Sequence, residues 1–143
     1  MPDPETLIMH ATSVAVGNKA VLITGDSGRG KSALALEMMA RGATLVADDQ
    51  VILTRLESDL VLTCPEPLRG LIEARGVGLL HAPYASEAIL ALVVDMDQTE
   101  TERLPPHRTI TTLSKTFPLL HNVESRHFPA AILQYLRGTG RAD

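Results

Sequence analysis

The sequence has few of the cysteines that stabilise secreted proteins through disulfides or small domains through structural metal sites. Its 143 residues include one cysteine, Cys64, which excludes an internal disulfide. No group of Cys and His residues has the spacing of a zinc site. We therefore expect Cys64 to be a small buried hydrophobic side chain rather than a reactive thiol, in a protein of the reducing cytoplasm.

Positive charge and long apolar runs are also scarce. The chain has 13 Lys and Arg against 17 Asp and Glu, which gives a net charge of −4 and argues against nucleic acid as a partner. No stretch approaches the ~20 apolar residues of a membrane helix. The start, Met1–Glu5, is acidic and contains two prolines, unlike a secretory signal. We expect no membrane association and no export.

Aromatic residues make up only 3% of the chain, whereas hydrophobic residues make up 45%. The core is therefore expected to be largely aliphatic. The length suits one domain spanning residues 1–143, which can bury a core without disulfides or structural metal.

The first half of the chain predicts alternating strands and a helix. Its hydrophobic runs and helix formers predict a two-stranded hairpin, then a helix that stops at Gly42, then two strands. These elements are Thr6–Val16, Lys19–Thr24, Ser32–Arg41, Ala43–Ala47 and Gln50–Arg55. Strand, helix and strand in this order predict a βαβ unit with a parallel strand pair and a right-handed crossover.

The second half is less regular. We expect strands at Leu60–Thr63 and Ile89–Val94, a Pro-rich link at Cys64–Pro67 and a charged loop over 100–108. The apolar spacing of Pro129–Arg137 predicts a closing amphipathic helix, which serves either core packing or a subunit interface.

An eight-residue stretch, GDSGRGKS, carries the clearest chemistry. It follows the apolar run Ala20–Ile23, precedes the predicted helix and matches the phosphate-loop pattern G-x-x-x-x-G-K-S/T. In that pattern backbone N–H groups surround phosphate oxygens, the lysine reaches the β and γ oxygens, and the hydroxyl binds Mg²⁺. The candidate nucleotide-binding residues are Gly25, Asp26, Ser27, Gly28, Arg29, Gly30, Lys31 and Ser32.

Two adjacent acids, Asp48 and Asp49, end the strand that follows the helix. A carboxylate at this position can complete a Mg²⁺ site or act as a base toward a bound hydroxyl. The alternative is that one of these acids opens a turn or caps backbone N–H groups.

In four stretches, taken in order, the chain resembles the catalytic domain of HPr kinase/phosphorylase, the serine kinase of the bacterial phosphotransferase system. The stretches are IMHATSVAV with His10, the GDSGRGKS loop, LVADDQV at 45–51 and LIEARGVGLL at 71–80. This resemblance implies an α/β P-loop domain with phosphoenolpyruvate-carboxykinase-like topology, a mixed sheet flanked by helices. It covers roughly the first 80 residues.

The resemblance also implies roles for individual residues. Lys31 would hold ATP phosphates, Ser32 and Glu73 would bind Mg²⁺, and Asp48 would be the general base. Asp49, beside Asp48, would modulate the electrostatic environment of the metal ion and of Lys31.

Two further residues belong to the implied site. His10 would lie near the phosphates, and Arg75 falls in the segment tied to both activities of the family. Taken alone, a histidine in an apolar strand is more often a core or edge residue than a catalytic one, and the resemblance reverses this preference for His10. Glu73 and Arg75 could form a surface ion pair, and Arg108 is either a cation for the transferred group or a solvated loop charge.

The resulting hypothesis is a cytoplasmic, ATP- and Mg²⁺-dependent protein-serine kinase that acts on HPr or a related phosphocarrier and so regulates carbohydrate metabolism. Phosphate and pyrophosphate would take part in a reverse phosphorolysis, and the family's assembly favours a homo-oligomer. The sequence departs from the family at Ala33, where an acidic residue is usual. The alternatives are a non-catalytic ATP-binding signalling module, such as a partner of a phosphorelay sensor kinase, or a small-molecule kinase or NTPase.

Overall fold

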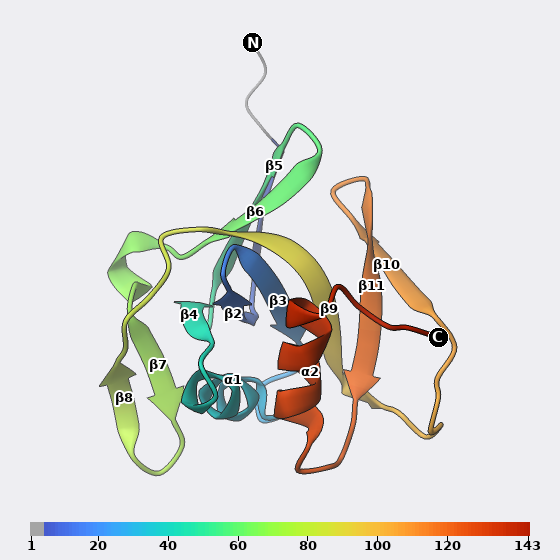
Figure 1. The fold of residues 1–143 in the computed structure, drawn as a ribbon. Coiled ribbons are helices and arrows are strands. Elements are labelled where there is room, and N and C mark those ends of the chain that lie inside the picture. The colour runs from blue at the N-terminus through green and yellow to red at the C-terminus, as the bar shows by residue number, and fades with distance from the viewer. Residues whose placement is uncertain (1–4) are drawn as a thin grey trace.

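A computed structural model of the chain describes residues 5–143 (Figure 1). The acidic start that argued against export therefore lies, apart from Glu5, outside the described residues. The elements are β1 Thr6–Met9, β2 Thr12–Val16, β3 Lys19–Thr24, α1 Lys31–Ala40, β4 Thr44–Ala47, β5 Val51–Leu56, β6 Asp59–Thr63, the 3-10 helix η1 Glu66–Leu68, β7 Leu71–Ala74, β8 Gly78–His81, β9 Ala88–Thr99, β10 Arg108–Thr112, β11 Lys115–Asn122 and α2 Phe128–Arg137.

The strands form a large mixed sheet, as the α/β prediction requires. Neighbouring strands follow the order β1-β5-β6-β9-β3-β2-β4, and the β10–β11 hairpin joins through β11 and β9. Strands β7 and β8 form a separate small sheet beside α1 (Figure 1).

The predicted hairpin is confirmed, but its first strand is shorter than expected. Strands β2 and β3 pair antiparallel across a turn in which Gly17 has a φ of 61°. The single strand predicted over Thr6–Val16 is wrong. The extended conformation is interrupted at His10 and Ala11, and the first part, β1, pairs with β5. This interruption places His10 between the end of β1 and the start of β2.

The predicted parallel pair within the βαβ unit is also wrong. Strand β4 pairs antiparallel with β2, and β2 lies between β4 and β3. Strands β2 and β9 occupy the two positions next to β3, so β4 pairs with the outer edge of β2. In this register Ser13 lies opposite Ala47, which brings the start of β2 beside the acids that follow β4.

Three parallel strands fix the site edge of the sheet. Strand β3 pairs parallel with β9, and β9 pairs parallel with β11, so their carboxyl ends meet at one edge. Strand β9 extends well beyond the predicted Ile89–Val94, and β8, β10 and β11 were not predicted. The loop expected over 100–108 is confirmed up to the first residue of β10.

Both helices cover one face of the sheet and lie next to each other (Figure 1). Met38 of α1 and Ile132 of α2 are fully buried against β-strand residues such as Val21 and Leu92. The closing helix is therefore a core element, with Leu133 and Leu136 also buried. A second aliphatic core lies within the curl of the sheet and contains the buried Cys64, as expected.

Candidate functional site

The phosphate loop connects β3 to α1 as the sequence predicts. Lys31 is the first residue of the helix, and Gly30 caps it with a φ of 89°, a conformation that favours glycine. Gly25 has a φ of 141°, and a Cβ added there would lie 3.1 Å from the Cβ of Met96. A side chain at Gly25 would thus strain the backbone and collide with β9.

The loop is fastened to β9 by Asp97. Its Oδ1 accepts a hydrogen bond from the Asp26 N–H at 3.0 Å and lies 3.3 Å from Nε of Arg29. Lys31 Nζ donates to the carbonyl oxygens of Gly25 and Asp26 at 2.8 and 3.0 Å. The sequence analysis missed Asp97 because it ended the predicted strand at Val94, whereas β9 continues to Thr99. The alternation of Asp95, Met96 and Asp97 was the available signal.

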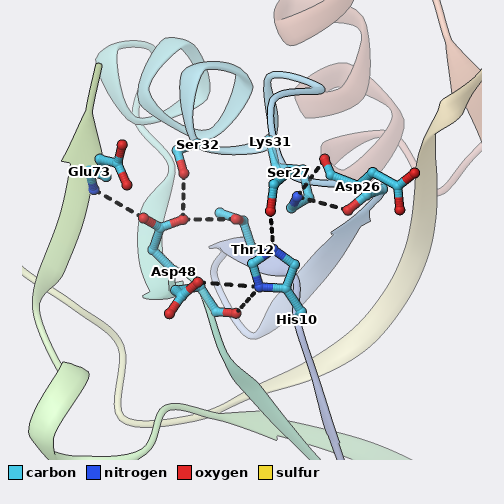
Figure 2. A network of polar contacts seen from close by, with 10 residues as sticks. His10, Thr12, Asp26, Ser27, Lys31, Ser32, Asp48 and Glu73 are labelled. Carbon is cyan, nitrogen blue, oxygen red and sulfur yellow. Dashed lines mark hydrogen bonds and ion pairs between the residues drawn. The ribbon is translucent and has the colours of Figure 1, made fainter. Parts of the chain in front are cut away.

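Asp48 forms what we call the buried side of the site, together with Thr12, Ser32 and the backbone of Glu73. Its Oδ1 accepts hydrogen bonds from Thr12 Oγ1 at 2.8 Å and from Ser32 Oγ at 2.7 Å (Figure 2). Its Oδ2 accepts one from the Glu73 N–H at 3.0 Å. The residue is only 6% exposed. Three elements of the fold therefore hold one carboxylate in place.

His10, Ser27 and Asp49 form the open side of the site. Nδ1 of His10 lies 3.0 Å from the carbonyl oxygen of Asp49 and 3.2 Å from its Oδ1, and Nε2 lies 3.3 Å from Ser27 Oγ (Figure 2). Both neighbours of Nδ1 are acceptors, so Nδ1 carries a proton. His10 is therefore an exposed link between the acid and the phosphate loop, and not a core residue.

Thr12 is the second site residue that sequence analysis missed. It is 1% exposed and donates its hydroxyl proton to Asp48. A buried polar side chain needs such a partner. Thr12 follows His10 by two positions, but nothing in a single apolar strand marks its hydroxyl as facing an acid 36 residues away in the chain.

Glu73 and Arg75 reach the site from the small sheet. Glu73 lies in β7, while Arg75 lies just beyond its end. Both are exposed. Within residues 5–143 no ion pair joins the two, so the shared surface pair that their spacing allowed is not formed. Their side chains are available to the cavity instead.

A cavity of about 560 Å³ collects most of the predicted residues. The predicted residues that line it are His10, Ser27, Gly28, Gly30, Lys31, Ser32, Asp48, Asp49, Glu73 and Arg75. Gly25, Asp26 and Arg29 form the part of the loop that faces β9 and do not line it. The cavity also has Thr12, Ala33, Leu36, Glu37 and Ala74 in its walls.

Arg108 is not part of this cavity. Its guanidinium donates to both carboxylate oxygens of Glu100 at 3.2 Å, and this pairing lowers the pKa of Glu100 below its usual value. The Glu100 side chain is 7% exposed. Arg108 is therefore paired with Glu100 and is not a free loop charge, while its proposed action on a transferred group stays a prediction.

The residues around Asp48 offer oxygen ligands to a metal. Ser32, Asp48 and Glu73 supply a hydroxyl and two carboxylates to the cavity. In the part of the chain that the structure describes, no group of three or more His, Cys, Asp or Glu side chains is placed to hold a metal ion by itself. Mg²⁺ is commonly held by one or two carboxylates together with substrate phosphates and water, and this donor set fits that pattern.

From Glu5 to the end of the chain, none of the helices is long and apolar enough to cross a membrane. The two α-helices have ten residues each, and one face of α2 is buried in the core.

Comparison with known proteins agrees with this geometry. Residues 4–111 match the family model of the HPr serine kinase C-terminal domain. The chain is 39% identical over 107 residues to an HPr kinase/phosphorylase of Stenotrophomonas maltophilia (strain K279a), covering 69% of this chain and 34% of the relative. It is 43% identical over 110 residues to that of Acidovorax sp. (strain JS42), covering 68% and 35%. The chain thus spans about a third of the length of these relatives.

A solved structure supports the fold. The HPr(Ser) kinase/phosphatase of Coxiella burnetii superposes with a TM-score of 0.78 at 24% sequence identity, covering 93% of this chain and 90% of that one. The α/β P-loop architecture predicted from the sequence is therefore confirmed. Because the family model matches most of its residues, the chain belongs to the family of HPr serine kinase C-terminal domains.

Proposed function

We propose that this chain is the catalytic domain of an ATP- and Mg²⁺-dependent protein-serine kinase that phosphorylates HPr. The observation that carries the proposal is the placement of Asp48. Its carboxylate is fixed by Thr12 and Ser32 in the same cavity as the phosphate loop. The names of the relatives supply the substrate, and the cytoplasm is the compartment in which ATP and a phosphocarrier would meet this domain.

ATP would bind with its phosphates in the loop. Backbone N–H groups and the positive end of the α1 dipole favour an anion at this position. Lys31 Nζ, which donates to two loop carbonyls, would exchange these contacts for phosphate oxygens. Mg²⁺ would be held by Ser32 and Glu73 and would neutralise charge on the β- and γ-phosphates.

Phosphoryl transfer would use Asp48 as the general base. The substrate serine oxygen forms a bond to the γ-phosphorus while the bond from that phosphorus to the β,γ-bridging oxygen breaks. The serine proton moves to the Asp48 carboxylate, and ADP leaves. Lys31 and Arg75 would stabilise the charge on the transferred group, since both line the cavity.

On the open side, His10 would position the loop rather than exchange protons with the serine. Its two ring nitrogens connect Asp49 to Ser27 of the loop. In a reverse reaction, phosphate would attack phosphoserine to give pyrophosphate, and protonated Asp48 would return its proton to the serine oxygen. The same acid can serve both reactions because the serine oxygen is the attacking group in the first and the leaving group in the second, although phosphate takes the place of ADP.

The test is transfer of label from γ-labelled ATP to HPr of the same organism with Mg²⁺, measured as acid-stable phosphoserine. Lys31→Ala and Asp48→Asn are tested in parallel, with nucleotide binding measured for each. Label that Asp48→Asn abolishes while its ATP binding persists supports the kinase. ATP binding without any label on HPr would overturn it in favour of a nucleotide-binding signalling module. Sedimentation of the same sample tests the proposed homo-oligomer.

A further inference from the structure

A second groove of about 540 Å³ lies beside the phosphate cavity. Its walls come from one side of α1 between Ala33 and the C-cap residue Arg41, from the segment between β11 and α2 and from the first residues of α2. Ala33 and Glu37 line both cavities, so the two adjoin on one face of α1. None of the residues predicted from the sequence lies in this groove.

We propose that this groove binds the base and ribose of the nucleotide whose phosphates occupy the loop. The inference rests on the proposed ATP binding and names the part of the molecule that recognises the rest of the ligand. Grooves of roughly 300–1,000 Å³ that combine apolar walls with a few polar groups are typical of small-molecule sites.

The sheet topology places the groove at a distance from the phosphate loop that one nucleotide can span. Thr24, Asp95 and His121 lie opposite one another on the parallel strands β3, β9 and β11. The phosphate loop begins one residue after Thr24, and the groove segment begins one residue after His121 with Asn122. Two strand spacings of about 4.8 Å separate them, roughly 10 Å in all. The α-phosphate and ribose can bridge that span.

The position of α1 also sets the direction in which the nucleotide leaves the phosphate loop. The acids and His10 lie in the phosphate cavity, where the γ-phosphate must point for transfer to a substrate. The nucleotide must then leave the loop on the other side of the α1 N-terminus, past Ala33. Figure 1 shows α2 next to α1, with the segment that enters α2 at the same end of the molecule as the loop.

The groove combines apolar surface with charged walls from Glu37, Arg41, Glu124 and Arg126. Phe128 and Pro129 are buried and form an apolar floor, and Val123 is a half-buried wall. Asn122 lines the groove with a side-chain amide, which offers a donor and an acceptor to the edge of a base. Glu37, where the two cavities adjoin, pairs with Arg41 at 2.7 Å and lies where the ribose hydroxyls would pass.

Calorimetric titration with Mg·ATP and with Mg·tripolyphosphate tests the proposal, because tripolyphosphate carries the phosphates without the base. Val123→Trp should fill the groove and weaken ATP binding by about tenfold or more while tripolyphosphate binding changes by less than about twofold. The matched control, Val77→Trp, places the same side chain at a site 76% exposed on the β7–β8 turn and should change neither affinity.

Equal ATP affinity in Val123→Trp and in the unmodified chain would overturn the base site. Equal affinity of the unmodified chain for ATP and tripolyphosphate would do the same. If Val123→Trp loses both ligands, Asn122→Leu decides: a selective loss of ATP supports the site, and no selective loss refutes it. If the unmodified chain binds neither ligand, the proposed nucleotide function itself fails and this inference fails with it.

Discussion

The two sides of the site hold their acids in different ways. On the buried side, Asp48 is 6% exposed and accepts hydrogen bonds from two hydroxyls and a backbone N–H. On the open side, the Asp49 side chain is 62% exposed and contacts His10, whose own side chain is 52% exposed. Neighbours in the chain thus have opposite environments, because the turn after β4 points one acid into the fold and the other toward solvent.

The two environments indicate which acid can serve as a fixed base. Each hydrogen bond to Asp48 comes from a different element, β2, α1 or β7, so its position depends on the whole fold. The carboxylate of Asp49 lies 3.2 Å from His10, and exposed ion pairs of this kind contribute little to stability. We therefore expect substitutions on the buried side to affect both folding and activity, and substitutions on the open side to affect mainly activity.

The largest effect is expected for Asp48→Ala. The change removes the proposed base, which is worth roughly 10²–10⁴ in rate. It also leaves the buried Thr12 hydroxyl without its acceptor, at a cost of about 1–3 kcal/mol in the free energy of unfolding. HPr phosphorylation and urea denaturation measure the two effects. A variant with unchanged stability would contradict the structural role of the carboxylate.

Thr12→Val has the next largest expected effect on the free energy of unfolding. Valine has nearly the same shape as threonine but cannot donate to Asp48, so one of its hydrogen bonds is lost. We expect a loss of about 1 kcal/mol in unfolding free energy. If all of it reflects poorer positioning of the base, the rate falls by roughly tenfold or less. Ser13→Ala is a control on the same strand, since Ser13 Oγ is buried and has no hydrogen-bond partner among residues 5–143.

The contrast between the two sides was only partly visible in the sequence. The phosphate loop was predicted because its glycines, lysine and serine lie in consecutive positions between a strand and a helix. Asp48 and Asp49 were found together because they end an apolar run. The sequence did not say which acid is buried, since that depends on the left-handed conformation of Asp49, whose φ is 73°.

Contacts between distant segments account for what the sequence analysis missed. Strand β4 pairs with β2 because β2 and β9 occupy the two positions next to β3. No local pattern in the sequence reveals this arrangement. Thr12 and Asp97 act through partners on other strands or loops. The residues of β10 and β11 are mostly half-buried or exposed, so their hydrophobic alternation is weak.

His10→Asn tests the open side. The side chain is half-exposed, so we expect the free energy of unfolding to change by less than about 0.5 kcal/mol. The contact with Ser27 of the phosphate loop weakens, and HPr phosphorylation should fall, by less than about 100-fold and by less than in Asp48→Asn. A loss of stability as large as that of Asp48→Ala would show that the open side is also a structural element.

The smallest difference in kinase rate is expected between two variants at Asp49, where backbone and side chain can be separated. Asp49→Gly and Asp49→Ala both remove the carboxylate that lies 3.2 Å from His10, but both keep the backbone carbonyl that contacts the same ring at 3.0 Å. Only alanine must adopt the φ of 73° with a Cβ, which costs about 1 kcal/mol. Asp49→Gly should therefore be the more stable of the two by about that amount in urea denaturation, while their kinase rates match. Equal stabilities would mean that the turn relaxes in Asp49→Ala. Asp48 would then lose its alignment with Ser32, and the kinase rate of that variant would fall below that of Asp49→Gly.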